Sequence, residues 1–179
     1  MSLFLATLTI GLLLVLFGVV LLLSTPAIAS TLKSLPRSQV GSYIFFGVGA
    51  AWFLWIVAHL GEADFGEYRT LLFIGFAAIS ILSFYYVPDF LAVRGLSVLT
   101  LLGAWPFLKT AYMHYEIPSR LFMVTFLYIA VALALVFGVV PYRLRDFFQW
   151  LFMSHGRSRS LGAGLLTYGL LLVVVAFAY

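Results

Sequence analysis

The sequence contains no cysteine and few charged residues. Without thiols, the chain cannot form disulfides, thiolate metal sites or a cysteine nucleophile. Charged residues make up 9% of the 179 residues and hydrophobic residues 64%, a balance far outside that of soluble domains. Six acids and ten bases are too few to cover the core of a soluble protein of this size. The composition therefore predicts that a lipid bilayer surrounds the chain.

Long apolar runs occupy most of the sequence. A helix that crosses the hydrocarbon of a bilayer needs roughly 20 apolar residues, because its backbone amides have no water to bind there. We predict an all-α fold, a polytopic membrane helical bundle that forms a single integral membrane domain over residues 1–179. Its six expected transmembrane helices are residues 3–24, 43–60, 71–87, 90–112, 121–140 and 161–179.

Two of these spans have alternative interpretations. The first is followed by Ala27-Ile28-Ala29, which resembles a signal-peptidase site. We expect an uncleaved anchor, since no base precedes the apolar run and the run is longer than that of a signal peptide. The fourth span carries Arg94 and Lys109 on either side of a short apolar stretch. It crosses the bilayer if both side chains reach toward opposite interfaces, and otherwise it forms a re-entrant loop.

Residues 142–153 have the period of an amphipathic helix. Leu144, Phe147, Phe148, Leu151 and Phe152 share one face of a helical wheel, and Arg145, Asp146 and Gln149 share the other. We predict an interfacial helix that lies flat at the membrane surface. The alternative is a polar continuation of the fifth span, which Pro141 disfavours.

The bases are distributed unevenly over the predicted loops. With six spans, the odd-numbered loops collect seven bases and the even-numbered loops three. The positive-inside rule then places the odd loops in the cytoplasm and both termini on the non-cytoplasmic side. Seven residues are expected to contact lipid headgroups or the interface: Arg94, Lys109, Arg143, Arg145, Trp150, Arg157 and Arg159.

Small residues mark two places where helices can approach one another closely. Five glycines are expected to pack against another helix: Gly47, Gly49, Gly162, Gly164 and Gly169. Besides the lipid bilayer, the expected partners are other membrane subunits or further copies of this chain. Nucleic acid is not expected, because the bases flank apolar segments.

Four residues form a candidate metal site on the non-cytoplasmic side. His59 and Glu62 share one helical face if the second helix continues past its apolar run, and His114 and Glu116 lie in the next outer loop. Imidazoles and carboxylates are the groups that a divalent metal or a proton relay requires. Their spacing matches no known metal motif, which favours interfacial histidines without a ligand. We predict no bound cofactor.

No catalytic set is recognisable, and the sequence favours a protein that is not an enzyme. It lacks a Gly-x-Ser-x-Gly elbow and the glycine-rich loops that bind phosphates. The favoured function is a structural or accessory subunit of a membrane assembly. One alternative is a small oligomeric transporter or channel, for which only hydroxyls are available within the spans. The second alternative is a redox or metal-binding subunit that uses the outer histidines and carboxylates.

Overall fold

The structure is a computed structural model that describes residues 1–179, and all of its regular secondary structure is helical. Six helical segments are long and apolar enough to cross a membrane, which confirms the all-α prediction and the six apolar helices. They are α1 (Leu3–Leu23), Gln39–Ala58 with α3 (Gln39–Gly41) and α4 (Gly47–Ala58), Gly66–Tyr86 with α5 (Arg69–Tyr86), α6 (Leu91–Ala111), α7 (Arg120–Val139) and α9 (His155–Phe177). Two shorter helices are α2 (Pro26–Ser34) and α8 (Tyr142–Leu151).

The helices form two compact units. The first consists of Met1–Lys33, Gly103–Leu133 and Arg145–Tyr179, and the second of Ser34–Leu102 and Ala134–Leu144. Helices α6 and α7 therefore each contribute to both units.

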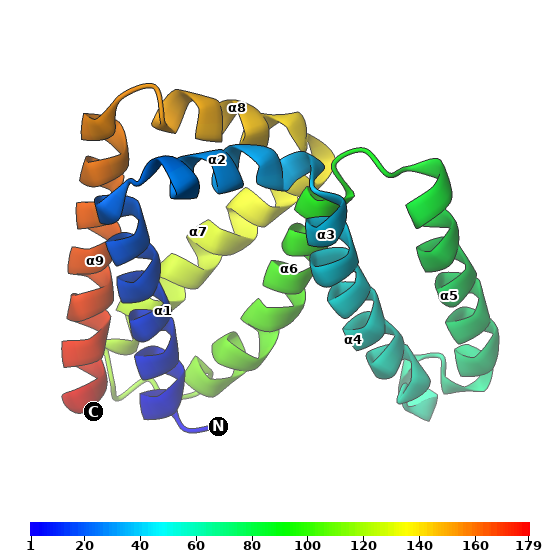
Figure 1. The fold of residues 1–179 in the computed structure, drawn as a ribbon. Coiled ribbons are helices and arrows are strands. Elements are labelled where there is room, and N and C mark those ends of the chain that lie inside the picture. Colours follow the sequence, from blue (N-terminus) through cyan, green and yellow to red (C-terminus); the bar gives the residue numbers. More distant parts are fainter. The chain divides into compact units, whose positions relative to one another are not determined.

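In the first unit, α1 and α9 lie side by side and antiparallel (Figure 1). Glycines on both helices make this close approach possible. A Cβ atom at Gly18 would lie 2.6 Å from the backbone nitrogen of Leu166, and one at Gly169 would lie 2.7 Å from the backbone nitrogen of Val15. Both distances are too short for any side chain. The two backbones are therefore in direct contact, as in small-residue interfaces between membrane helices.

Thr7 joins three segments of the first unit. Its buried hydroxyl lies 3.4 Å from the sulfur of Met123 in α7, to which it donates, and 3.1 Å from the hydroxyl of Tyr179. The rings of Phe4 and Phe177 meet edge to face nearby, with centroids 5.4 Å apart. Both ends of the chain thus lie at the same end of the α1–α9 pair (Figure 1).

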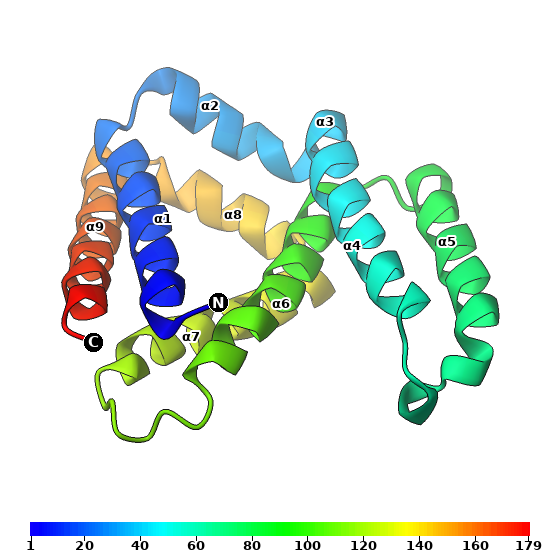
Figure 2. The same ribbon diagram turned by 90° about the horizontal axis from the view of Figure 1, so that it is seen from below.

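In the second unit, α4 and α5 form an antiparallel hairpin (Figure 2). Aromatic rings join the two helices, since Phe53 packs edge to face on Phe76 with centroids 5.0 Å apart. The π-helical turn η2 (Ser42–Phe46) precedes α4 and contacts α6 at Gly95. A Cβ atom at Gly95 would overlap the backbone of this turn, so glycine is required there. Helix α5 has no buried residue.

Two helix boundaries differ from the apolar runs, and one helix was not expected. The second span begins at Gln39 rather than residue 43, because the hydroxyl of Ser38 accepts a hydrogen bond from the backbone N–H of Gly41. The sixth begins at His155 rather than residue 161, since Ser154 caps it. Capping side chains fix helix ends independently of hydropathy. Helix α2 lies in a segment where no helix was expected.

The segment after α7 forms a separate helix. Helix α7 ends at Val139 and α8 begins at Tyr142, so α8 is not a continuation of the fifth span. Pro141 separates the two helices, as its missing N–H and fixed φ predict. Helix α6 is continuous from Leu91 to Ala111 and includes Pro106. The 21 residues of α6 are enough for a full crossing of the bilayer. That α6 crosses the membrane and that α8 lies at the interface stay predictions.

Candidate functional site

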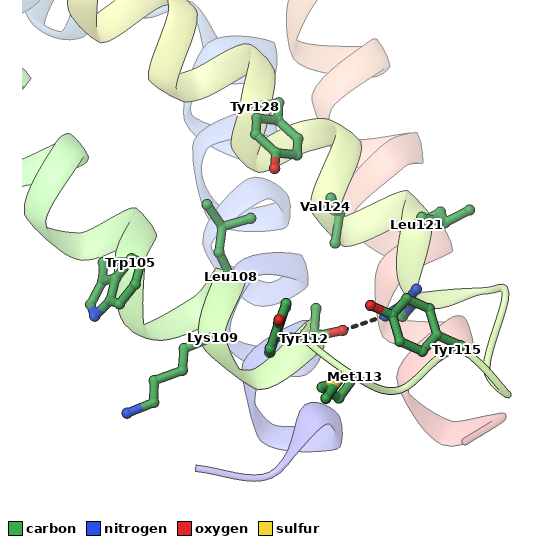
Figure 3. A pocket seen from close by; sticks show the side chains of 11 residues that line it. Trp105, Leu108, Lys109, Tyr112, Met113, Tyr115, Leu121, Val124 and Tyr128 are labelled. Carbon is green, nitrogen blue, oxygen red and sulfur yellow. Dashed lines mark hydrogen bonds between the residues drawn. The ribbon is translucent and has the colours of Figure 1, made fainter.

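A cavity of about 580 Å³ lies in the first unit, between the C-terminal part of α6 and the N-terminal part of α7 (Figure 3). Its volume lies within the range of roughly 300–1,000 Å³ that is typical of ligand pockets. The lining is mainly apolar and aromatic, includes two bases and contains no acid. The lining residues are Trp105, Leu108, Lys109, Ala111, Tyr112, Met113, Tyr115, Arg120, Leu121, Val124 and Tyr128.

The chain forms this cavity through a turn between two helices. Helix α6 ends at Ala111, and Met113 takes up a left-handed backbone conformation with φ of 68°. Residues other than glycine rarely adopt this backbone conformation, which here reverses the chain toward α7. Trp105 and Tyr128 line the cavity and are 70% and 61% exposed. The cavity is therefore a groove that opens on the surface of the unit.

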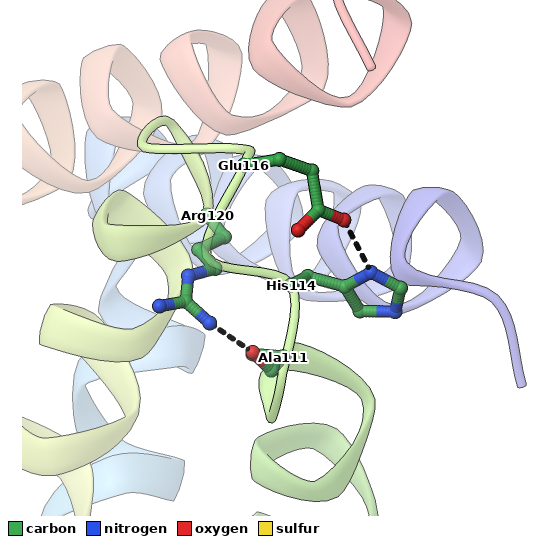
Figure 4. A network of polar contacts seen from close by, with 4 residues as sticks. All are labelled: Ala111, His114, Glu116 and Arg120. Atoms are coloured by element: carbon green, nitrogen blue, oxygen red, sulfur yellow. Dashed lines mark hydrogen bonds and ion pairs between the residues drawn. The ribbon is translucent and has the colours of Figure 1, made fainter.

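Arg120 closes the loop of residues 112–119. Its Nη1 donates a hydrogen bond to the carbonyl of Ala111, the last residue of α6 (Figure 4). The guanidinium also lies over the ring of Tyr115, 4.8 Å from its centroid. One side chain at the start of α7 thus holds the end of α6 and the middle of the loop together.

His114 and Glu116 form a hydrogen-bonded pair in the same loop (Figure 4). The Nδ1 of His114 lies 3.1 Å from a carboxylate oxygen of Glu116, and both side chains are exposed. The pKa of the Glu116 carboxyl lies below its ordinary value of 4.5, mainly because of a backbone hydrogen bond and secondly because of the hydrogen bond with His114. Both interactions favour the ionised carboxylate.

His59 and Glu62 do not share a helical face, because α4 ends at Ala58 and the helix does not continue past its apolar run. His59 has a non-helical backbone, with φ of −111°, and Gly61 follows it. The Nδ1 of His59 lies 2.8 Å from the carbonyl oxygen of Trp55, to which it donates, and the two rings lie 4.6 Å apart. Glu62 begins a short 3₁₀ turn and is exposed.

The four candidate metal ligands belong to different units. His59 and Glu62 lie in the second unit, and His114 and Glu116 in the first. Neither unit brings three or more histidine, aspartate or glutamate side chains together in a group that could hold a metal ion. The two residues that do meet, His114 and Glu116, satisfy each other.

The residues expected at the lipid interface lie at helix ends or on α8. Arg94 is in the first turn of α6 and Lys109 in its last turn. Arg94 forms no ion pair with Asp89, the acid five residues before it. Arg143, Arg145 and Trp150 lie on α8, and Arg157 and Arg159 in the first two turns of α9.

Two of these bases have partners within the first unit. The guanidinium of Arg157 lies over the ring of Trp150 at 4.8 Å and donates a hydrogen bond of 3.1 Å to the Trp150 carbonyl. This contact fixes the corner between α8 and α9. Arg145 pairs with the neighbouring Asp146 at 2.7 Å. Contact of these bases with headgroups stays a prediction.

The five glycines expected in helix packing fall into two groups. Gly49 packs against α6 in the second unit, where a Cβ atom would lie 3.3 Å from Val98. Gly162 and Gly169 face α1 in the first unit. A Cβ atom at Gly47 or Gly164 would meet nothing within 4 Å. The space beside these two glycines is open.

Four of the hydroxyls that a transport path would need bind carbonyls of their own helices. Ser80, Ser83 and Thr100 donate to carbonyls one turn earlier, at 2.8, 2.7 and 2.8 Å. Thr9 does the same at 2.7 Å. Such bonds satisfy the hydroxyl within the helix.

Sequence reasoning missed the α6–α7 groove, apart from Lys109. The sequence feature that could have indicated the groove is a group of aromatic residues close to two bases, in and around one short loop. These aromatic residues are Trp105, Tyr112, Tyr115 and Tyr128. Only the three-dimensional structure shows that these side chains surround one cavity.

Comparisons with protein-family models, with curated proteins and with solved structures found no match. The function of the chain is therefore inferred from its own residues and their geometry.

Proposed function

We propose that the chain is a multi-pass integral membrane protein that serves as a structural or accessory subunit of a membrane assembly. The observation that carries this proposal is the division of small residues on α9. Gly162 and Gly169 contact the backbone of α1, whereas a Cβ atom at Gly164 would meet nothing within 4 Å. A glycine on a lipid-facing surface does not strengthen contacts with lipid tails. On a helix-facing surface it lets a second helix approach the backbone closely, which favours helix association.

The open face of α9 has the composition of a helix interface. At 100° per residue, Gly164 shares one side of the helix with three small side chains, and all four are exposed. They are Ser160, Ala163, Gly164 and Thr167. This side is distinct from the side that contacts α1, so a second helix can pack there without disturbing the α1–α9 pair.

Helix α5 supports the same proposal from the second unit. It contacts α4, where Phe76 packs against Phe53, and none of its residues is buried. Gly75 in its middle also has nothing within 4 Å of a Cβ position. An apolar helix with so little burial inside its own chain has most of its surface free for lipid or for another subunit.

The position of the chain ends supports the proposed membrane topology. Both termini lie at the same end of the α1–α9 pair, as an even number of crossings requires. We place the odd-numbered loops in the cytoplasm and the termini on the other side, following the excess of bases in the odd loops.

The test is the mass of the protein after extraction in a mild detergent, measured by native mass spectrometry. We expect an assembly of defined composition that is larger than the 19.9 kDa chain. Gly164→Leu, which places a large side chain on the open face, should release the monomer. Gly164→Ala keeps the face small and should retain the assembly.

The mass also distinguishes the two kinds of partner. A whole multiple of the chain mass indicates a homo-oligomer, and any other defined mass indicates a different subunit. A wild-type protein that is monomeric under these conditions, or an assembly that Gly164→Leu leaves intact, would contradict the proposal.

A further inference from the structure

The geometry points to a binding site for one anionic phospholipid in the α6–α7 groove of the first unit, with an acyl chain in the groove and the negative headgroup in the positive field of Lys109 and Arg120. This inference goes beyond the accessory function and does not depend on it. It rests on the volume, lining, charge and position of the groove.

The volume and lining of the groove suit an acyl chain. A cavity of about 580 Å³ has room for one long apolar ligand rather than only a few waters. Leu108 and Val124 project into it from the two helices, and Tyr128 forms part of the same wall (Figure 3). Leu108 and Val124 also pack against the buried core of the unit, which holds these walls in place. An acyl chain would bury apolar surface against both helices.

The charge of the lining selects a negative headgroup. Lys109 and Arg120 are the charged residues of the groove, and both are bases. The nearest acid of the loop, Glu116, is paired with His114. Arg120 gives one N–H to the Ala111 carbonyl, and a guanidinium has five such donors, so others are available to a phosphate. A zwitterionic headgroup would lack the net charge that these bases favour.

The position of the groove favours a membrane lipid over a dissolved anion. It lies where two apolar helices end, at the level where Tyr112 and Tyr115 are exposed. Tyrosines of this kind are enriched at the boundary between hydrocarbon and headgroups. A lipid at that boundary places its phosphate and its tail at the heights where the groove offers bases and apolar walls.

Delipidated protein in mild detergent, titrated with phosphatidylglycerol or phosphatidylcholine of equal chain length, tests this site by native mass spectrometry. One base near an anionic headgroup contributes a factor of about five in binding. We expect one phosphatidylglycerol to bind at least about fivefold more tightly than phosphatidylcholine. Lys109→Gln should reduce this preference about fivefold. Lys33→Gln removes the same charge from exposed α2, outside the groove, and should leave the preference unchanged.

A second variant tests the apolar part of the groove. Val124→Phe fills the space between α6 and α7 without a change of charge, and should reduce the binding of both lipids. The melting temperature of Val124→Phe shows whether the fold is retained. If the fold is lost, Lys109→Gln, which alters an exposed residue, still tests the site. Equal binding of the two lipids to the wild type, or equal losses in Lys109→Gln and Lys33→Gln, would overturn the inference.

Discussion

The hydroxyl oxygens of Ser24 and Ser158 lie 2.6 Å apart across the α1–α9 interface, and both side chains are buried. Ser24 also donates to the carbonyl of Leu21, and its left-handed backbone ends α1. Because a hydrogen bond between membrane helices contributes about 0.6 kcal/mol on average and at most about 1.7 kcal/mol, we expect a coupling energy in this range. A double-mutant cycle with Ser24→Ala and Ser158→Ala, measured by unfolding in mixed SDS micelles, provides the value. Purely additive effects would show that the two hydroxyls do not interact.

The glycines of the α1–α9 interface should be intolerant of even a methyl group. In Gly18→Ala the new Cβ would lie 2.6 Å from the Leu166 backbone nitrogen, so the helices must separate. We expect a loss of about 1–3 kcal/mol in the free energy of unfolding, the usual cost of overpacking. Gly164→Ala is the matched control on α9, where nothing lies within 4 Å. The control should be neutral or stabilising by up to about 1 kcal/mol, because alanine is the better helix former.

Arg120 should determine the order of the loop between α6 and α7. Arg120→Met removes the hydrogen bond to the Ala111 carbonyl and the contact with the Tyr115 ring. We expect faster hydrogen exchange over residues 111–119, with no change in α9. Arg120→Lys keeps the charge but lacks the planar guanidinium, so it should restore protection only in part. Unchanged exchange in Arg120→Met would show that the loop is ordered by other contacts.

The hydrogen bond between His114 and Glu116 in the same loop should be sensitive to acid. The pKa of Glu116 is lower in the folded chain than its ordinary value of 4.5, through a backbone hydrogen bond and the hydrogen bond with His114. The ionised carboxylate therefore favours the ordered loop above its unfolded pKa, and this contribution is lost as pH falls through the folded pKa. NMR titration of the Glu116 carboxyl should give a midpoint below 4.5 in the wild type. In His114→Ala the midpoint should rise, and a midpoint that does not move would remove the role of His114.

The apolar runs identified the six long helices because hydropathy reports directly where a backbone needs its own hydrogen bonds. Their ends were less predictable, since single capping residues such as Ser38 and Ser154 extend a helix beyond its apolar run. Proline was the better guide at residue 141, where it separates α7 from α8.

Most contacts between helices could not be predicted from the sequence. Gly162 and Gly164 stand two residues apart in the same apolar run, yet Gly162 faces α1 and Gly164 is open, because helix rotation decides which side meets a neighbour. The pairing of α1 with α9 joins segments from opposite ends of the chain, and the π-helical turn against Gly95 leaves no mark in hydropathy. His114 and Glu116 were expected in one loop, and their hydrogen bond is consistent with that proximity.

The most direct test of the account is a topology map made with single cysteines in a chain that has none of its own. Exposed positions in successive loops are Ser30, Asp64, Asp89, His114 and Met153, each substituted by cysteine in turn. If six helices cross the membrane with the odd loops in the cytoplasm, an impermeant maleimide will label Asp64→Cys and His114→Cys on intact cells. The other three positions will react only after the membrane is permeabilised. Labelling of Asp89→Cys and His114→Cys from the same side would contradict the crossing of α6 and with it the six-span arrangement.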